Sequence, residues 1–287
     1  MTDTQGDCMP VTGGRLGHAR VAILTAVQGE TEALRLVGGL SHRVPTWDYH
    51  VAPDANLSFP DVIHREIDRN NIQSGESVRE VIEHWQPELL ILCGIAGGIN
   101  NREDITVGDI VIPRYIHYCS FAKLSAGGQQ RRYIPFDYPS INLHARYVAP
   151  FRYDSSWITD SLRSTLPEDC APKVLTESLV AGDKIYGNPD SEEQKLMMEQ
   201  YDEAVAVDME SVGLCRGVAA MRNNPLYNPR LLIVRSVSDM IGDLKNDEMR
   251  KIWRPHACTI ASTFTWRVVT DILDTEPDPR NLVEAIA

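Results

Sequence analysis

Leu89-Leu90-Ile91-Leu92-Cys93-Gly94-Ile95-Ala96-Gly97-Gly98 is the stretch that decides the fold. Its first five residues are apolar without interruption, which is typical of a strand buried on both faces in a helix-covered parallel sheet. The glycine-rich string that follows could be a tight turn into a helix, or could bring backbone N–H groups close to an anion or a sugar. It lacks the G-x-G-x-x-G fingerprint of dinucleotide-binding loops, so the residues alone leave both interpretations open.

Regular patterns before this stretch predict the neighbouring elements. Residues 21–27 form another short apolar run, which predicts a buried strand, and residues 30–37 then follow a helical pattern. Residues 41–71 are rich in turns and predict short strands. Ser74 can cap a further helix, which Pro87 ends and whose apolar face carries Val78, Val81, Ile82 and Trp85. Strand, helix and strand in this order imply a right-handed crossover and a largely parallel sheet.

The rest of the chain continues this alternation and shows no linker, repeat or low-complexity segment. Residues 125–172 carry no sustained period and predict loops with one short helix. Residues 105–112 predict a turn followed by a strand, and further strands are expected at residues 175–181, 204–207 and 231–239. The expected helices are residues 192–201, 209–221 and a long closing helix with Met249, Ile252, Trp253, Ile260, Phe264 and Val268 on its apolar face. We therefore expect a single α/β domain over residues 20–274, after a flexible polar leader (residues 1–19) and before a C-terminal tail (residues 275–287).

Composition and charge exclude several classes of function. The chain has 287 residues, 43% of them hydrophobic, which is enough to bury a sizeable core. Forty acidic residues against 28 basic ones leave a net charge of −12, so a nucleic-acid polymer is repelled. The six cysteines lie far apart without a C-x-x-C pair, which indicates free thiols in a reducing compartment rather than a zinc site or a disulfide framework. No apolar run suits a membrane span or a signal peptide, so we expect a soluble, cytoplasmic protein, and we expect no metal or cofactor.

Acidic residues follow three of the expected strands. In open α/β sheets a ligand binds beyond the carboxyl ends of the strands, where Glu30, Glu210 and Asp239 are expected. Each has an ordinary alternative, since Glu30 could complement a helix dipole, Glu210 could be one more surface charge and Asp239 could cap a helix. Carboxyl groups brought together from different strands can divide the work of acid and base between them. Together they predict a candidate active site at this edge of the sheet.

The segments that matter together are the first strand with Glu30, Gly94-Ile95-Ala96-Gly97-Gly98, Val107-Gly108-Asp109-Ile110-Val111, Asp208-Met209-Glu210 and Val234-Arg235-Ser236-Val237-Ser238-Asp239. In their order and spacing they resemble the purine nucleoside phosphorylase and nucleosidase superfamily over about residues 20–273. The chain is most similar to the branch of methylthioadenosine and S-adenosylhomocysteine nucleosidases and of the nucleosidase domains of bacterial and fungal defence proteins. Residues 239–253, His256 and Ala257, with Lys245-Asn246 between, resemble the defence proteins in particular. The resemblance implies a three-layer α/β/α domain with a mixed, mostly parallel central sheet, and a homo-oligomer, either dimer or hexamer.

The resemblance also implies roles for the site residues. Asp239 would protonate or hydrogen-bond a purine ring nitrogen, Glu210 would bind the ribose hydroxyls, and Glu30 would position the attacking water. Tyr186 has an ordinary alternative as a core aromatic residue. The residues expected to bind the substrate, or to support the Asp239 loop, are Met209, Ala96, Gly97, Ile185, Tyr186, Ser238 and Arg235.

The turn after the first strand bears on the choice between hydrolysis and phosphorolysis. Phosphorylases of the superfamily carry a phosphate-binding Gly-Asp-Pro-x-Arg string there, whereas this chain has Thr25-Ala26-Val27-Gln28-Gly29-Glu30. A carboxylate at that position repels phosphate, so we expect hydrolysis of an N-glycosidic bond to free base and ribose or ribose phosphate. The alternatives are a phosphate-dependent phosphorylase and a catalytically silent nucleoside-binding protein on the same fold. A Rossmann dehydrogenase and a serine hydrolase are disfavoured because their motifs are missing.

Basic residues bear on the substrate. Relatives often have a Gly-x-Gly turn before the helix that precedes the second strand, but Asp68-Arg69-Asn70-Asn71 fills it here. Arg69, with Lys123, Arg131 and Arg132 in the loop region, could recognise phosphate groups or could be solvated surface cations. Adenine-type nucleosides and 5′-phosphorylated purines such as AMP and ATP are therefore both candidate substrates.

Overall fold

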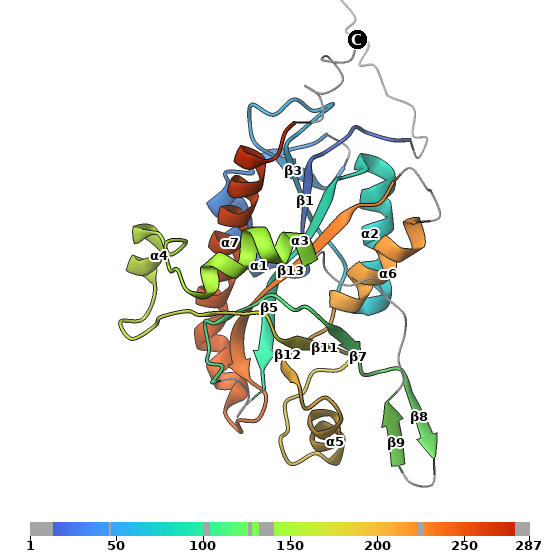
Figure 1. Cartoon of the computed structure of the whole chain (residues 1–287), viewed down its shortest axis with the longest axis vertical. Helices are drawn as coiled ribbons and strands as arrows, with labels where there is room; N and C mark the ends of the chain where they lie inside the picture. Colours follow the sequence, from blue (N-terminus) through green and yellow to red (C-terminus); the bar gives the residue numbers. More distant parts are fainter. Residues whose placement is uncertain are drawn as a thin grey trace, which may run out of the picture.

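The computed structural model describes residues 14–45, 47–99, 104–125, 128–131, 141–222 and 227–278. Within these residues a mixed sheet of eleven strands forms the middle of the molecule (Figure 1). Its strands are β1 (Val21–Thr25), β2 (His42–Arg43), β3 (Tyr49–Val51), β4 (Val62–Glu66), β5 (Leu89–Gly98), β6 (Ile110–Val111), β7 (Ile116–Tyr118), β10 (Val174–Leu175), β11 (Ser178–Ala181), β12 (Ala204–Asp208) and β13 (Arg230–Met240). A separate two-stranded sheet pairs β8 (Ala122–Ser125) with β9 (Gly128–Arg131). The helices are α1 (Gln28–Gly38), α2 (Asn71–Trp85), α3 (Ile141–Leu143), α4 (Asp160–Thr165), α5 (Glu192–Gln200), α6 (Ser211–Met221) and α7 (Asn246–Thr275), with further helical turns at His144–Val148 and Ala149–Arg152.

Strand β5 lies at the centre of the sheet between two parallel neighbours. Leu90 is in register with Ala22 of β1 on one side and with Leu231 of β13 on the other. Antiparallel pairs occur as well, among them β12 with the end of β5 and β6 with β13. The sheet is therefore mixed and mostly parallel, as predicted.

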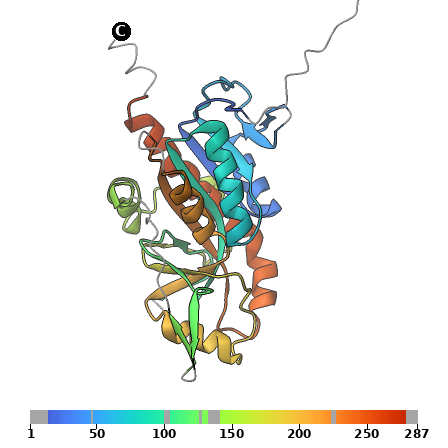
Figure 2. The same cartoon turned by 90° about the vertical axis from the view of Figure 1, so that its right-hand side faces the viewer.

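Helices cover both faces of the sheet. Alternate residues of β1 point in opposite directions, so Ala22 and Leu24 pack under α2 and α6, while Val21 and Ile23 pack against α1 and α7. Figure 1 shows these two helical layers, and Figure 2 shows α2 and α6 side by side on one of them. The predicted three-layer α/β/α architecture is thus confirmed.

Several boundaries differ from the sequence-based expectation. The glycine-rich string is not a turn: it continues β5 as far as Gly98, because β13 and β12 go on pairing with it. The cap of α2 is Asn70 and not Ser74, since the Asn70 side chain accepts from the N–H groups of Ile72 and Gln73. The turn and strand expected over residues 105–112 contain the short strand β6, and the strand expected over residues 175–181 is divided into β10 and β11. Residues 122–125 pair with residues 128–131 as β8 and β9.

Burial near the two ends of the described chain differs from the sequence-based expectation. Helix α7 runs to Thr275, and its first turns leave the core, so that Ile252 of the predicted apolar face is 66% exposed. Residues 14–19 of the expected leader are described, and there Ala19 is already buried. Within the described part of the chain, no helix has the length and apolar character that crossing a membrane requires.

Candidate active site

A pocket of about 280 Å³ opens at the carboxyl ends of β1, β12 and β13, beside the glycine-rich half of β5. This is the edge at which ligands bind in open α/β sheets. The tertiary structure brings many of the sequence-predicted residues into its wall, namely Glu30, Arg69, Ala96, Gly97, Ile185, Tyr186, Met209, Glu210, Ser238 and Asp239.

Three backbone N–H groups hold the carboxylate of Glu30. Its Oε2 accepts from Ala26 at 2.8 Å and from Val27 at 3.2 Å, and its Oε1 accepts from Ile95 at 2.8 Å. N–H groups that converge in this way form a binding site for an anion, and here the anion is the protein's own carboxylate. Burial raises the pKa of Glu30, while Arg235 and the three donors act in the opposite direction.

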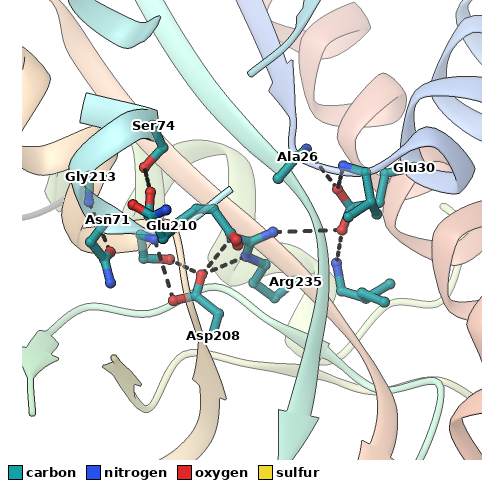
Figure 3. A network of polar contacts seen from close by, with 12 residues as sticks. Ala26, Glu30, Asn71, Ser74, Asp208, Glu210, Gly213 and Arg235 are labelled. Carbon is teal, nitrogen blue, oxygen red and sulfur yellow. Dashed lines mark hydrogen bonds and ion pairs between the residues drawn. The ribbon is translucent and has the colours of Figure 1, made fainter. Parts of the chain in front are cut away.

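Arg235 lies in β13 beneath the pocket with its side chain fully buried. Its Nε donates to Asp208 Oδ2 at 2.8 Å, its Nη2 donates to Glu210 Oε2 at 3.1 Å, and its Nη1 lies 3.9 Å from Glu30 Oε1 (Figure 3). Where β5 passes this group it requires glycine, because a Cβ at Gly94 would overlap both the guanidinium and the Glu30 carboxylate. One buried cation therefore links the carboxylates that follow β1 and β12.

Glu210 faces the pocket just after β12. Burial raises the pKa of Glu210, Arg235 opposes this shift, and the charges of Asp208 and Glu30 add to it. The backbone N–H of Asn70 also lowers this pKa. When ionised, such a carboxylate is an acceptor only, which suits the hydroxyl groups of a sugar.

Asp239 is held near the end of β13 by two donors. The hydroxyl of Ser238 donates to Oδ1 at 2.6 Å, and Nη2 of Arg250 donates to Oδ2 at 2.9 Å. The carboxylate side chain is only 3% exposed. Ser238 thus contacts Asp239 as expected, but Arg235 does not: the expectation that it supports this loop is corrected, because the three other carboxylates hold its guanidinium.

The loop after β11 supplies another part of the wall. Tyr186 packs with its hydroxyl 3.5 Å from Cys119 Sγ, whereas Ile185 is 70% exposed. Lys184, which sequence reasoning missed, also lines the pocket and forms an ion pair with Glu193. This loop gives the pocket an apolar surface beside its charged floor.

Cations line the pocket in an arrangement that only partly matches the prediction. Arg69 is in the wall, but Lys123 lies exposed on β8 and is not among the described lining residues. Arg131 belongs to β9, and Arg132 lies outside the described residues. Arg250 and Arg254, which sequence reasoning missed, also line the pocket. Their spacing of four places them on one side of α7, but this spacing alone does not indicate a pocket.

The arrangement suits the cleavage of a bond between a sugar and a base. Such a reaction needs a group that hydrogen-bonds or protonates the leaving base and carboxylates that stabilise a cationic sugar and hold a nucleophile. Asp239 can serve the base, while Glu30 and Glu210 come from a separate, Arg235-linked cluster. Among the described residues, no group of three or more His, Cys, Asp or Glu side chains is arranged to hold a metal ion.

Comparison with known proteins agrees with this architecture. A methylthioadenosine/S-adenosylhomocysteine nucleosidase of Staphylococcus epidermidis is 22% identical over 184 residues, which are 64% of this chain and 71% of that protein. The structure of such a nucleosidase from Neisseria meningitidis, in complex with methylthio-immucillin-A, has a TM-score of 0.64 at 18% identity and covers 88% of this chain and 98% of its own. The futalosine hydrolase of Helicobacter pylori has the same TM-score of 0.64 at 16% identity, with 88% and 98% covered. A Borrelia burgdorferi protein described as a nucleosidase of the first kind, bound to adenine, reaches 0.66 at 18% identity, with 88% and 100% covered. The family model of the phosphorylase superfamily matches residues 77–270, and this chain therefore belongs to that superfamily.

Proposed function

We propose that this protein is a purine nucleosidase, which uses water to break the N-glycosidic bond of an adenine-type nucleoside or nucleotide. The observation that carries the proposal is the Glu30 carboxylate, which occupies the three N–H groups of Ala26, Val27 and Ile95. Phosphate would have to displace a buried negative charge from these donors, whereas a neutral water can bind beside it. The likeness to nucleosidases of other organisms supports the same choice.

The chain's own residues suffice for each step of such a hydrolysis. Asp239 donates a proton or hydrogen bond to the purine ring as the C–N bond breaks, and the bonding electrons leave with the base. Glu210 accepts hydrogen bonds from the ribose hydroxyls and lowers the energy of the oxocarbenium-like sugar. Glu30 takes one proton of the water whose oxygen bonds to the anomeric carbon. The products are free base and ribose, or ribose phosphate from a nucleotide.

We further propose that a 5′-phosphorylated purine such as AMP or ATP is a substrate. Four cations line the pocket, and two of them, Arg69 and Arg254, have no ion-pair partner among the described residues. Arg69 lines the pocket together with Glu210, the proposed ribose ligand, and directly precedes Asn70, whose N–H lowers the pKa of that carboxyl. We therefore place Arg69 on the sugar side of the pocket. A guanidinium there can bind phosphate oxygens in a bidentate way.

The test is product analysis after incubation with adenosine, inosine, methylthioadenosine, AMP and ATP, each with and without phosphate. Free base with ribose or ribose phosphate, independent of added phosphate, is the expected result. Ribose 1-phosphate formed only when phosphate is present would identify a phosphorylase instead. Binding without any product would identify a silent nucleoside-binding protein. Cleavage of methylthioadenosine with no base released from AMP or ATP would refute the nucleotide proposal alone.

A further inference from the structure

The turn before α2 holds a backbone conformation that its residue does not favour. Asn70 has φ 70° and ψ 159°, a region that is essentially restricted to glycine. A residue keeps such an unfavourable conformation only where the surrounding contacts hold it there, and residues of this kind are common at functional sites. The surroundings of Asn70 are the wall of the pocket, since Arg69 and Glu210 both line it.

This conformation lets Asn70 hold the first turn of α2. Its side-chain Oδ1 accepts from the N–H groups of Ile72 at 3.0 Å and Gln73 at 3.1 Å, and its carbonyl oxygen accepts from Ser74 Oγ at 2.6 Å. Its N–H also lowers the pKa of Glu210. Asn70 thereby fixes the turn that presents Asn71 to the rest of the site.

The next residue, Asn71, is fully buried and joins α2 to two further parts of the site. Its Nδ2 donates to the carbonyl of Gly182 and to Asp183 Oδ1, both at 3.1 Å, and its own N–H donates to the same Oδ1 at 3.3 Å. Its Oδ1 accepts from the N–H of Gly213 in α6 at 3.1 Å (Figure 3). Gly182 and Asp183 begin the loop that carries Lys184, Ile185 and Tyr186 to the pocket.

Asp183 is fixed from its other side as well. Its Oδ2 accepts from the hydroxyl of Tyr118 at 2.6 Å, and its N–H donates to Ser120 Oγ at 3.2 Å. The loop is therefore anchored at its first two residues, although Lys184 and Ile185 beyond them are exposed. An anchor of this kind determines where the exposed end of the loop stands over the pocket.

We infer that Asn70 and Asn71 are positioning residues of this site: together they set the distance between the sugar carboxylate Glu210 and the base-side loop at residues 182–186. The inference rests on the proposed nucleosidase function for its catalytic readout. Asn71 acts on the sugar side through its Oδ1, which accepts from Gly213 in the first turn of the helix that Glu210 caps, and on the base side through its Nδ2. Asn70 holds the turn from which Asn71 makes these contacts. A substrate that spans both sides is then held by one rigid turn.

The experiment is an exchange of the hydrogen-bonding groups at positions 71 and 183. Asn71→Asp has the same shape and still accepts from Gly213, but it removes the donor and sets a carboxylate against Asp183. We expect KM to rise about tenfold, as for one lost hydrogen bond to a charged group, with kcat changed much less. Adding Asp183→Asn restores a donor and acceptor between the two positions, so KM should recover in part. Asn56→Asp, an exposed site where Oδ1 accepts from Ser58, is the matched control.

Hydrogen–deuterium exchange of residues 178–186 gives a second readout that does not depend on turnover. It should be faster in Asn71→Asp and slower again in the double variant. Unchanged KM and unchanged exchange in Asn71→Asp would overturn the inference, as would a fall in kcat alone that the double variant does not rescue. If the wild-type protein cleaves no nucleoside, the proposed function fails, and the exchange data still decide whether Asn71 anchors the loop.

Discussion

Replacing Arg235 by Met tests the charge arrangement under the pocket. The substitution retains an unbranched, mostly apolar side chain and removes the buried charge together with its hydrogen bonds to Asp208 and Glu210. It leaves three carboxylates without their common cation: Asp208, 2.6 Å from Nη2; Glu210, 3.1 Å from the same atom; and Glu30, 3.9 Å from Nη1. Their side chains are 1%, 12% and 3% exposed, so water cannot replace the lost partner.

The expected loss of unfolding free energy follows from the proton that this cluster must then take up. Protonating one carboxyl group of ordinary pKa 4.5 at pH 7 costs about 3.4 kcal/mol, at about 1.4 kcal/mol per pH unit. This agrees with the roughly 3–5 kcal/mol measured when one partner of a buried ion pair is removed. For 287 residues the entropy of unfolding is about 0.6 kcal/mol/K, so Arg235→Met should lower Tm by about 6 °C at pH 7. The loss should shrink to about 1–2 kcal/mol near pH 5.5, because the carboxyls are then protonated more easily.

The matched control is Arg230→Met at the other end of the same strand. Arg230 makes a bidentate pair with Glu276 at 2.8 and 2.7 Å, but its side chain is 32% exposed. Loss of a solvent-accessible pair costs about 1 kcal/mol or less, with little dependence on pH in this range. Thermal unfolding of both variants and the wild type between pH 5 and 8 decides the matter. Equal losses of unfolding free energy in the two variants would refute the electrostatic account of the cluster. So would a loss in Arg235→Met that does not become smaller as the pH is lowered.

Three further predictions concern the same site. Asp239→Asn should lower kcat about 10²–10⁴-fold in a base-release assay without unfolding the protein. The control is Asp247→Asn, which removes the second carboxylate partner of Arg250; its side chain is 72% exposed, and the variant should keep full activity. Equal activity of the two variants would remove Asp239 from its role. The acidic limb of kcat/KM should have its midpoint above pH 4.5, because burial raises the pKa of Glu30 and Glu210. Both carboxyl groups must be ionised to work, so activity is lost as the pH falls through these raised values. A midpoint at or below pH 4.5 in a rate profile from pH 4 to 9 contradicts this prediction. Asn70→Gly should raise the unfolding free energy by about 0.5–1 kcal/mol, because the relief of backbone strain exceeds the small costs of the lost cap and of a more flexible unfolded chain. Asn70→Ala keeps the strain and loses the cap, so it should lower the unfolding free energy by about 1 kcal/mol. Calorimetry that places the glycine variant below the wild type would show that the turn is not strained.

Much of the fold could be predicted from local patterns. Uninterrupted apolar runs such as residues 89–93 are compatible with burial on both faces, and a helix between two of them implies a parallel pair. Element boundaries were less predictable where pairing partners decide them. Gly94 to Gly98 looked like a turn because glycine favours turns, but β12 and β13 supply hydrogen bonds that keep these residues in a strand.

The site was predictable to the extent that it consists of residues at strand ends. Glu30 follows β1 and Asp239 lies near the end of β13. These two strands run parallel to β5 on either side of it, so their carboxyl ends meet at one edge of the sheet. Arg250 and Arg254 were missed because α7 begins at that edge and passes over the pocket, which no local pattern reveals. Lys123 was expected near the ligand because it lies in a basic segment, but its β8–β9 hairpin forms a sheet of its own.

The sequence by itself determined the order of strands and helices, the acidic groups available for chemistry and the absence of a phosphate-binding string after the first strand. These features depend on residues close together in the chain. Only the tertiary structure decided which charges meet: Arg235 joins three carboxylates from distant segments instead of supporting Asp239, and Asn71 joins α2 to residues more than 100 positions away. The physical reason is that the energy of a buried charge or amide depends on the partners that surround it in space, and chain neighbours do not specify those partners.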